Sequence, residues 1–175
     1  DQSNAACLLR MGDKTYFLVR DVNREQEKEG VSCLEFNMDK FDFEEKSKKL
    51  FESSSKIARG FFYSGYGVQN DLSDGDNMKY FGACQVVTSQ NQGVVMFTYM
   101  VRPEERNNNI SKERMGIYCF DANMDKRWGD EIQLPYVESR IDKISFFVSN
   151  DAKVYLLAKV FDGELIKESE IKKNP

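Results

Sequence analysis

The sequence predicts an all-β protein assembled from antiparallel four-stranded meanders, and three observations support this fold class. Short segments rich in β-branched and aromatic residues alternate with turn residues along the chain, as strands and tight turns do. The tetrapeptide Asn37-Met38-Asp39-Lys40 recurs as Asn123-Met124-Asp125-Lys126, 86 residues later, and each copy follows a short apolar segment. Helical periodicity is scarce, because residues 44–50 are the only candidate helix and their apolar face is thin.

The composition is that of one globular domain with an ordinary core. The chain has 175 residues, of which 41% are hydrophobic and 13% aromatic, enough to fill a sizeable interior. The 25 Lys and Arg residues nearly balance the 29 Asp and Glu residues, which argues against nucleic-acid binding and against a disordered tail. No run of about 18 apolar residues occurs, so no membrane span is predicted. The absence of histidine excludes Ser-His-Asp and Cys-His catalysis and every histidine-containing metal site.

Two units along the chain share one order of elements. Each begins with a hairpin, over residues 7–19 in the first unit and residues 84–101 in the second. A charged loop follows, and the apolar segments 31–36 and 115–120 then lead into the repeated Asn-Met-Asp-Lys turn. Each unit is therefore predicted to contain a strand, a tight turn, a buried strand, a variable loop, a strand, a turn and a final strand.

A third hairpin follows, with strands over residues 144–148 and 153–161. Its second strand is close to a continuous apolar run at residues 154–161, which predicts burial on both faces. The three units span about residues 6–64, 80–136 and 140–175. The third ends after its hairpin, because the remaining residues are too few and too charged to supply two more core strands.

Repeated four-stranded meanders of this length are typical of the blades of a β-propeller, in which each sheet is buried on both faces. Two and a half blades cannot close a ring of at least four. We therefore expect the chain to be a partial propeller that belongs to a longer protein. The alternative is a compact β-sandwich or barrel. The chain begins at Asp1 without a methionine or an apolar leader, which indicates a removed leader or a longer parent.

The four cysteines fit the repeat better than a disulfide framework. Cys7 and Cys84 open the two hairpins, and Cys33 and Cys119 lie 86 residues apart, as the repeated turns do. No Cys-x-x-Cys pair suggests zinc binding or redox chemistry. We expect all four to be small apolar core residues, with two disulfides in an exported protein as the alternative.

One stretch resembles a known family. Trp128-Gly129-Asp130-Glu131-Ile132-Gln133-Leu134-Pro135-Tyr136, which follows residues 120–126, resembles the blade signature of exported β-propeller proteins of unknown function in Bacteroides-type bacteria. The similarity extends over residues 93–162 and is weak over residues 7–50, where Phe41 or Phe43 replaces Trp128. The resemblance implies a propeller fold and a periplasmic or extracellular location, and it brings no catalytic residues.

Two groups of residues are candidate binding sites. Trp128, Tyr136 and Tyr66 could form an aromatic platform for a sugar or a peptide, although a structural position for Trp128 between adjacent blades is favoured. Asp71, Asp74 and Asp76 lie in one short loop and offer the oxygen ligands that calcium prefers. The loop departs from the EF-hand pattern, so a solvated loop is favoured and no other cofactor is expected.

These observations predict a non-catalytic protein-interaction or scaffold module of the bacterial cell envelope. The variable loops at residues 20–30, 65–77 and 102–114 would present its binding surface to a protein partner. The alternative is a carbohydrate-binding or carbohydrate-active domain. Paired carboxylates can hydrolyse glycosides without histidine, but no spacing singles out two of them, and no catalytic residue is assigned.

Overall fold

The computed structural model describes residues 6–44, 46–57, 78–81, 84–102, 112–137 and 140–161, and every element in these ranges is a β-strand. The strands are β1 (Ala6–Met11), β2 (Lys14–Asn23), β3 (Lys28–Asn37), β4 (Asp42–Phe43), β5 (Lys48–Glu52), β6 (Met78–Phe81), β7 (Cys84–Thr88), β8 (Val94–Val101), β9 (Lys112–Asp121), β10 (Lys126–Val137), β11 (Ile141–Val148) and β12 (Val154–Val160). Neighbouring strands pair antiparallel in meanders. The predicted all-β class is confirmed.

The first sheet contains β1 to β5 in the order β1-β2-β3-β4, with β5 also pairing with β3. The short strands β4 and β5 together take the place of the predicted fourth strand. The candidate helix at residues 44–50 is not formed in its described part, and residues 48–50 belong to β5, because Leu50 and Phe51 are buried in the core and Phe51 pairs with Val31. Burial of these apolar side chains outweighs the weak helical tendency of the charged residues before them.

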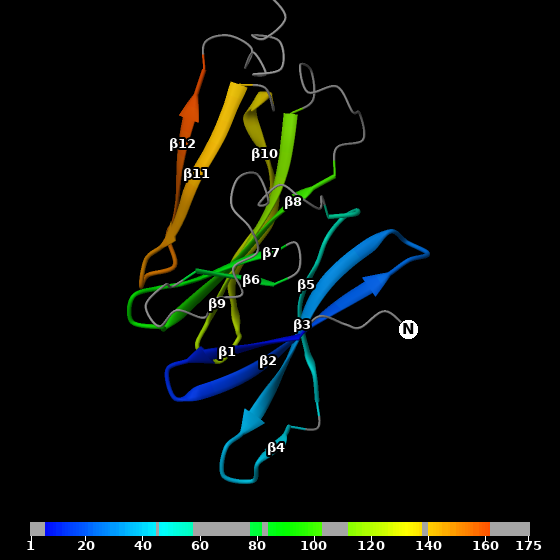
Figure 1. Cartoon of the computed structure of the whole chain (residues 1–175), viewed down its shortest axis with the longest axis vertical. Helices are drawn as coiled ribbons and strands as arrows, with labels where there is room; N and C mark the ends of the chain where they lie inside the picture. The colour runs from blue at the N-terminus through cyan, green and yellow to red at the C-terminus, as the bar shows by residue number, and fades with distance from the viewer. Residues whose placement is uncertain are drawn as a thin grey trace, which may run out of the picture.

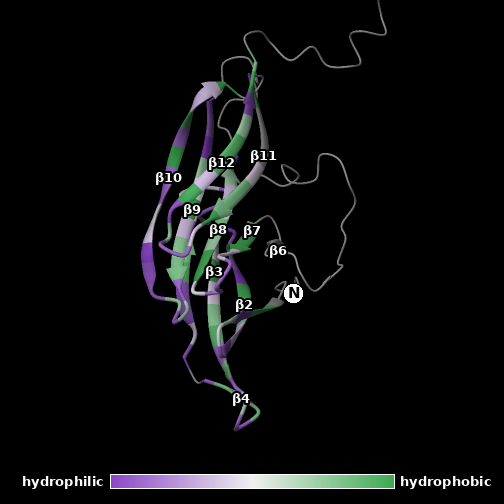
Figure 2. Cartoon of the chain, turned by 90° about the vertical axis from the view of Figure 1, so that its left-hand side faces the viewer, coloured by the Kyte–Doolittle hydropathy of each residue, from purple (hydrophilic) through white to green (hydrophobic). Residues whose placement is uncertain are grey.

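The second sheet has the order β10-β9-β8-β7-β6 and is the central layer of the molecule. All eight residues of β8 are buried, because this strand lies in the middle of the sheet and is covered on both faces. Figure 2 shows that much of β10, at the edge of the same sheet, is hydrophilic. The contrast is expected of a sheet with a dry centre and a solvated edge.

The third sheet is the hairpin β11–β12, and the three sheets stack in chain order (Figure 1). One core cluster joins the first sheet to the second and includes Leu18 and Phe97. The other joins the opposite face of the second sheet to the third and includes Met96, Phe146 and Val148. Among the described strands all three sheets are open, and no barrel or ring closes.

Two glycines of the second sheet make room for a stack of aromatic rings. Gly116 pairs with Tyr99, and a Cβ at Gly116 would lie 2.3 Å from the Tyr99 ring. Gly129 pairs with Tyr118 in the same manner, with a closest approach of 2.5 Å. Phe51 of the first sheet stacks on both tyrosines, with ring centroids 5.4 Å from Tyr99 and 4.8 Å from Tyr118. The glycines thus allow the two sheets to pack through flat aromatic faces.

Two predictions about individual segments are wrong. The second strand of the third hairpin is not buried on both faces, because among the described residues only the second sheet covers it and its burial alternates along β12. Residues 20–30 are not a long loop, since β2 continues to Asn23 and β3 begins at Lys28. The Arg20 and Glu29 side chains form an ion pair across these strands, which lets charged residues extend the hairpin.

Candidate functional site

Trp128 and Tyr136, the predicted binding aromatics, both lie on β10 but towards opposite ends. Trp128 pairs with Cys119 of β9, whereas Val137, next to Tyr136, pairs with Lys112. At about 3.3 Å per residue the two aromatic residues are roughly 26 Å apart along the strand. Both side chains are partly exposed, but they do not come together as one platform.

Trp128 connects the second sheet to the third. Its indole Nε1 donates a hydrogen bond of 2.7 Å to the carbonyl oxygen of Ala152, in the turn between β11 and β12. Ala152 has a positive φ of 63°, and its buried side chain belongs to the second core cluster. The polar edge of the indole therefore contacts the neighbouring sheet, while the side chain stays 40% exposed.

The other predicted candidates fall on parts of the chain that the structure does not describe. Tyr66, Asp71, Asp74 and Asp76 lie outside the described residues, as do residues 65–77 and most of the loop at residues 102–114. Within the described residues, no group of three Cys, Asp or Glu side chains is placed to hold a metal ion. None of these residues forms a helix long and apolar enough to cross a membrane.

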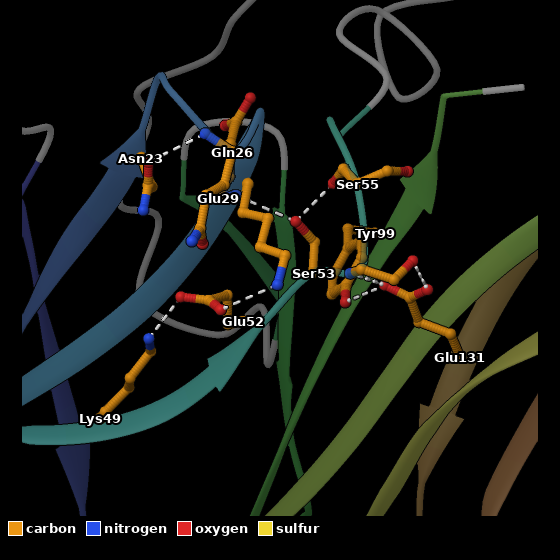
Figure 3. A network of polar contacts seen from close by, with 11 residues as sticks. Asn23, Gln26, Glu29, Lys49, Glu52, Ser53, Ser55, Tyr99 and Glu131 are labelled. Carbon is orange, nitrogen blue, oxygen red and sulfur yellow. Dashed lines mark hydrogen bonds and ion pairs between the residues drawn. The ribbon is translucent and has the colours of Figure 1, made fainter. Parts of the chain in front are cut away.

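The partly buried carboxylate of Glu131 joins the first and second sheets (Figure 3). Its oxygens accept hydrogen bonds from the Ser54 backbone N–H at 2.8 Å, from the Ser54 hydroxyl and from the Tyr99 hydroxyl at 2.8 Å. The Arg114 guanidinium lies 3.7 Å away. Because these groups satisfy the carboxylate and Tyr99 is fully buried, the arrangement stabilises the sheet contact and offers no open site for a substrate.

A second group of polar contacts, around Glu29 of β3, lies beside those of Glu131 (Figure 3). Glu29 is buried, and its carboxylate pairs with Arg20 while its backbone N–H donates to the Ser53 hydroxyl at 3.0 Å. The Ser53 hydroxyl in turn donates to the Ser55 carbonyl. Figure 3 shows Ser53 and Ser55 between Glu29 and Glu131. Residues 53–55 are therefore held from both sides, and the two acids fix the segment that leaves β5.

The three cysteines whose side chains the structure describes lack the properties of catalytic or redox residues. Cys33, Cys84 and Cys119 are free and buried, which agrees with the prediction that they fill the core, and the side chain of Cys7 lies outside the described part. Burial raises the pKa of the Cys33 thiol to about 11 and those of Cys84 and Cys119 to about 12. These thiols are therefore uncharged at neutral pH, whereas a nucleophilic cysteine needs a lowered pKa.

An exposed apolar surface on the third sheet is the feature that sequence reasoning missed. Phe147, Tyr155 and Leu157 are 54%, 55% and 60% exposed. Phe147 pairs with Tyr155 across the strands, and their ring centroids are 6.0 Å apart. The three side chains, here named the open face, project from the side opposite Phe146 and Leu156 because successive residues of a strand alternate. Contiguous exposed apolar residues of this kind mark interaction surfaces.

The sequence contains only a partial signal for this surface. Residues 154–158 are apolar on both faces, and such a run is typical of a strand between two layers. The pattern therefore indicates that both faces of β12 suit burial. It does not indicate that one face remains exposed, because the exposure of each face depends on whether another sheet of the described part packs against it.

Comparisons of the chain with protein-family models, with curated proteins and with solved structures find no match. The resemblance of residues 120–136 to exported propeller proteins therefore stays a prediction.

Proposed function

We propose that the chain is a non-catalytic protein-interaction or scaffold module of a bacterial cell envelope, in which sheets stack in series as the blades of a β-propeller do. The single observation that carries the proposal is the open face, a row of large apolar side chains on a sheet made of two described strands. An isolated two-stranded sheet is only marginally stable in water. A protein partner that covers Phe147, Tyr155 and Leu157 would both bury them and complete the layer.

The stacking mode supports the blade interpretation. The first sheet packs face to face on the second, and the second packs face to face on the third, so the central sheet is covered on both sides. Propeller blades bury their faces in the same serial manner. The envelope location depends on the resemblance of residues 120–136 alone.

A protein surface fits these residues better than a glycan does. Trp128 uses its indole N–H within the fold, and Tyr136 lies far from it along β10. The open face presents two aromatic rings and a leucine without a converging set of polar groups. Sugars are bound through hydrogen bonds in addition to ring contacts, whereas protein interfaces bury apolar and aromatic anchors.

Site-specific photo-crosslinking tests the proposal. A photoreactive phenylalanine analogue replaces Tyr155 in the full chain, expressed in the cell of origin, and the control carries it at Ile132, which is 43% exposed on β10. We expect a discrete protein adduct from position 155 and none from position 132. A glycan array run in parallel tests the alternative. Specific glycan binding that is lost in Tyr155→Ser, together with no protein adduct from position 155, would overturn the proposal.

A further inference from the structure

The third sheet repeats the hairpin geometry of the second. In the turn from β7 to β8, the Ser89 backbone N–H donates to the Val94 carbonyl, and the Val94 N–H donates to the Ser89 hydroxyl at 3.0 Å. In the turn from β11 to β12, Ser149 and Lys153 make the same two hydrogen bonds, the second also at 3.0 Å. Ser149 therefore occupies the position of Ser89, and Lys153 that of Val94.

This match assigns each residue of the third sheet a counterpart in the second. The pairs that matter are Val87 with Phe147, Met96 with Tyr155 and Thr98 with Leu157. In the second sheet these positions are buried, and Val87 and Met96 belong to the cluster that the third sheet covers. The open face is thus the side of the third sheet on which a further sheet would pack if the stack continued.

The opposite end of the series has a face of matching character. Tyr16 and Leu18 point from β2 towards the second sheet, so Phe17 projects from the other side. Phe17 pairs with Leu34, and its ring lies 5.4 Å from that of Phe43, which is 43% exposed. No described strand covers this side. We name Phe17, Leu34, Phe36 and Phe43 the outer face of the first sheet.

We propose that a second copy of this chain places the outer face of its first sheet on the open face of the third sheet. This inference deepens the proposed function and rests on it, because it names the protein partner. Within one chain, each sheet contacts the preceding sheet through the face that points towards the N-terminal end of the stack. The proposed contact follows the same rule, because the outer face is that face of the first sheet. Such a contact joins two different surfaces, so it is head to tail.

Light scattering over a range of protein concentrations tests the inference on the full chain. We expect a mass that rises with concentration above the 20.3 kDa of one copy. Leu157→Glu damages one surface and Phe43→Glu the other, and each should weaken self-association by at least about tenfold because a buried carboxylate lacks a partner there. Ile132→Glu introduces the same charge at an exposed position of β10 and should leave the mass unchanged.

Mixing the two variants distinguishes a head-to-tail contact from any other. The Leu157→Glu chain keeps its outer face and the Phe43→Glu chain keeps its open face, so an equimolar mixture should form a two-chain complex and nothing larger. A bifunctional maleimide gives a second measurement that needs no charged variant: Tyr155→Cys mixed with Phe43→Cys should crosslink between chains, whereas Tyr155→Cys alone should not. Cys33, Cys84 and Cys119 are buried, so they contribute little background, and Cys7→Ser in both chains removes the remaining thiol.

Three results would overturn the inference. They are a chain that stays monomeric at every concentration, a mixture of the two variants that stays monomeric, and a Leu157→Glu monomer that unfolds because another part of its own chain covers the open face. A monomeric chain that still gives a protein adduct from position 155 would leave the proposed function standing and remove only the second copy as its partner.

Discussion

The indole N–H of Trp128 donates a hydrogen bond to the carbonyl oxygen of Ala152, and this bond joins the second sheet to the turn of the third. The same relationship recurs one layer earlier, where the Tyr16 hydroxyl donates to the Ala122 carbonyl at 2.8 Å. In both cases an aromatic side chain of one sheet bonds a turn of the next. The stack is therefore held by apolar faces and by directed polar contacts at the turn side of each layer contact. These also include the hydrogen bond from the Asn91 backbone N–H to the Asn150 side-chain oxygen and the ion pair of Lys48 with Asp125.

Trp128→Phe should loosen the third sheet without affecting the first. Phenylalanine keeps a ring in place but cannot donate to Ala152, so the free energy of unfolding should fall by about 0.5–1.5 kcal/mol. Hydrogen exchange should speed up in β11 and β12 and stay unchanged in β2. Tyr16→Phe is the matched control, since it removes the equivalent bond between the first and second sheets. Unchanged exchange in β11 and β12 would contradict the prediction.

Glu131→Gln should weaken the contact between the first and second sheets. The carboxylate accepts from Ser54 twice and from Tyr99 once, and an amide has only one oxygen to accept with. We expect a loss of about 1–3 kcal/mol in urea unfolding. A double-mutant cycle with Tyr99→Phe should show coupling, because both changes remove the same bond. Additive losses would show that the Tyr99 bond contributes nothing.

Gly116→Ala should destabilise the central sheet. A methyl group at this position would lie 2.3 Å from the Tyr99 ring, which is fully buried and stacked on Phe51. The ring has no room to move away, so overpacking should cost about 1–3 kcal/mol. Gly93→Ala is the control, since it lies in a turn beside the Asn91 side chain. Equal melting temperatures for the two variants would contradict the aromatic stack.

How much of this arrangement the sequence predicts can be judged from the repeated tetrapeptide. In the first copy the Asn37 side-chain oxygen accepts from the backbone N–H groups of Asp39 and Lys40. In the second copy Asp121 has this role and accepts from Asn123 and Asp125. The repeat correctly indicated two turns after two strands. It did not give their register, because Asn and Asp both cap such turns and the second turn starts two residues earlier.

The site is harder to predict than the strands for a related reason. Alternating apolar residues place β7, β8, β11 and β12, since that signal is local. The contact between Gly116 and Tyr99 depends on the register between two strands, and the contact between Glu131 and Ser54 depends on how two sheets stack. Neither contact is a local property, so no local pattern in the sequence indicates it.

Alkaline pH should destabilise the protein through its buried thiols. Burial raises the pKa of Cys33 from 9.0 to about 11 and that of Cys119 from 9.0 to about 12, and it also raises the pKa of Tyr16. Between pH 9 and 12 the unfolded chain therefore loses protons that the folded chain keeps. The contribution of these groups to the free energy of unfolding is therefore fully present below pH 9 and is lost as pH rises towards 12.

Urea unfolding at successive pH values measures this effect. Cys119→Ala should have a shallower loss of stability between pH 9 and 12 than the natural chain, whatever its stability at pH 7, because one of the titrating groups is gone. Thiol reagents should react slowly with Cys33, Cys84 and Cys119 in the folded protein at pH 8 and rapidly in denaturant. An identical pH slope in the variant would rule out Cys119 as a contributor.

Two adjacent leucines of β12 provide the most direct test of the layer order. Leu156 pairs with Phe146 and packs against the second core cluster, whereas Leu157 is 60% exposed on the open face. Leu156→Ala should cost on the order of 2 kcal/mol, because it removes apolar contacts and leaves a cavity. Leu157→Ala should cost less than about 0.5 kcal/mol, measured at concentrations where the chain is a monomer. The two substitutions delete the same atoms one residue apart, so their difference reports only which side of the strand is covered. Equal costs would mean that β12 has a second layer within the same chain, and the open face would then be part of the core.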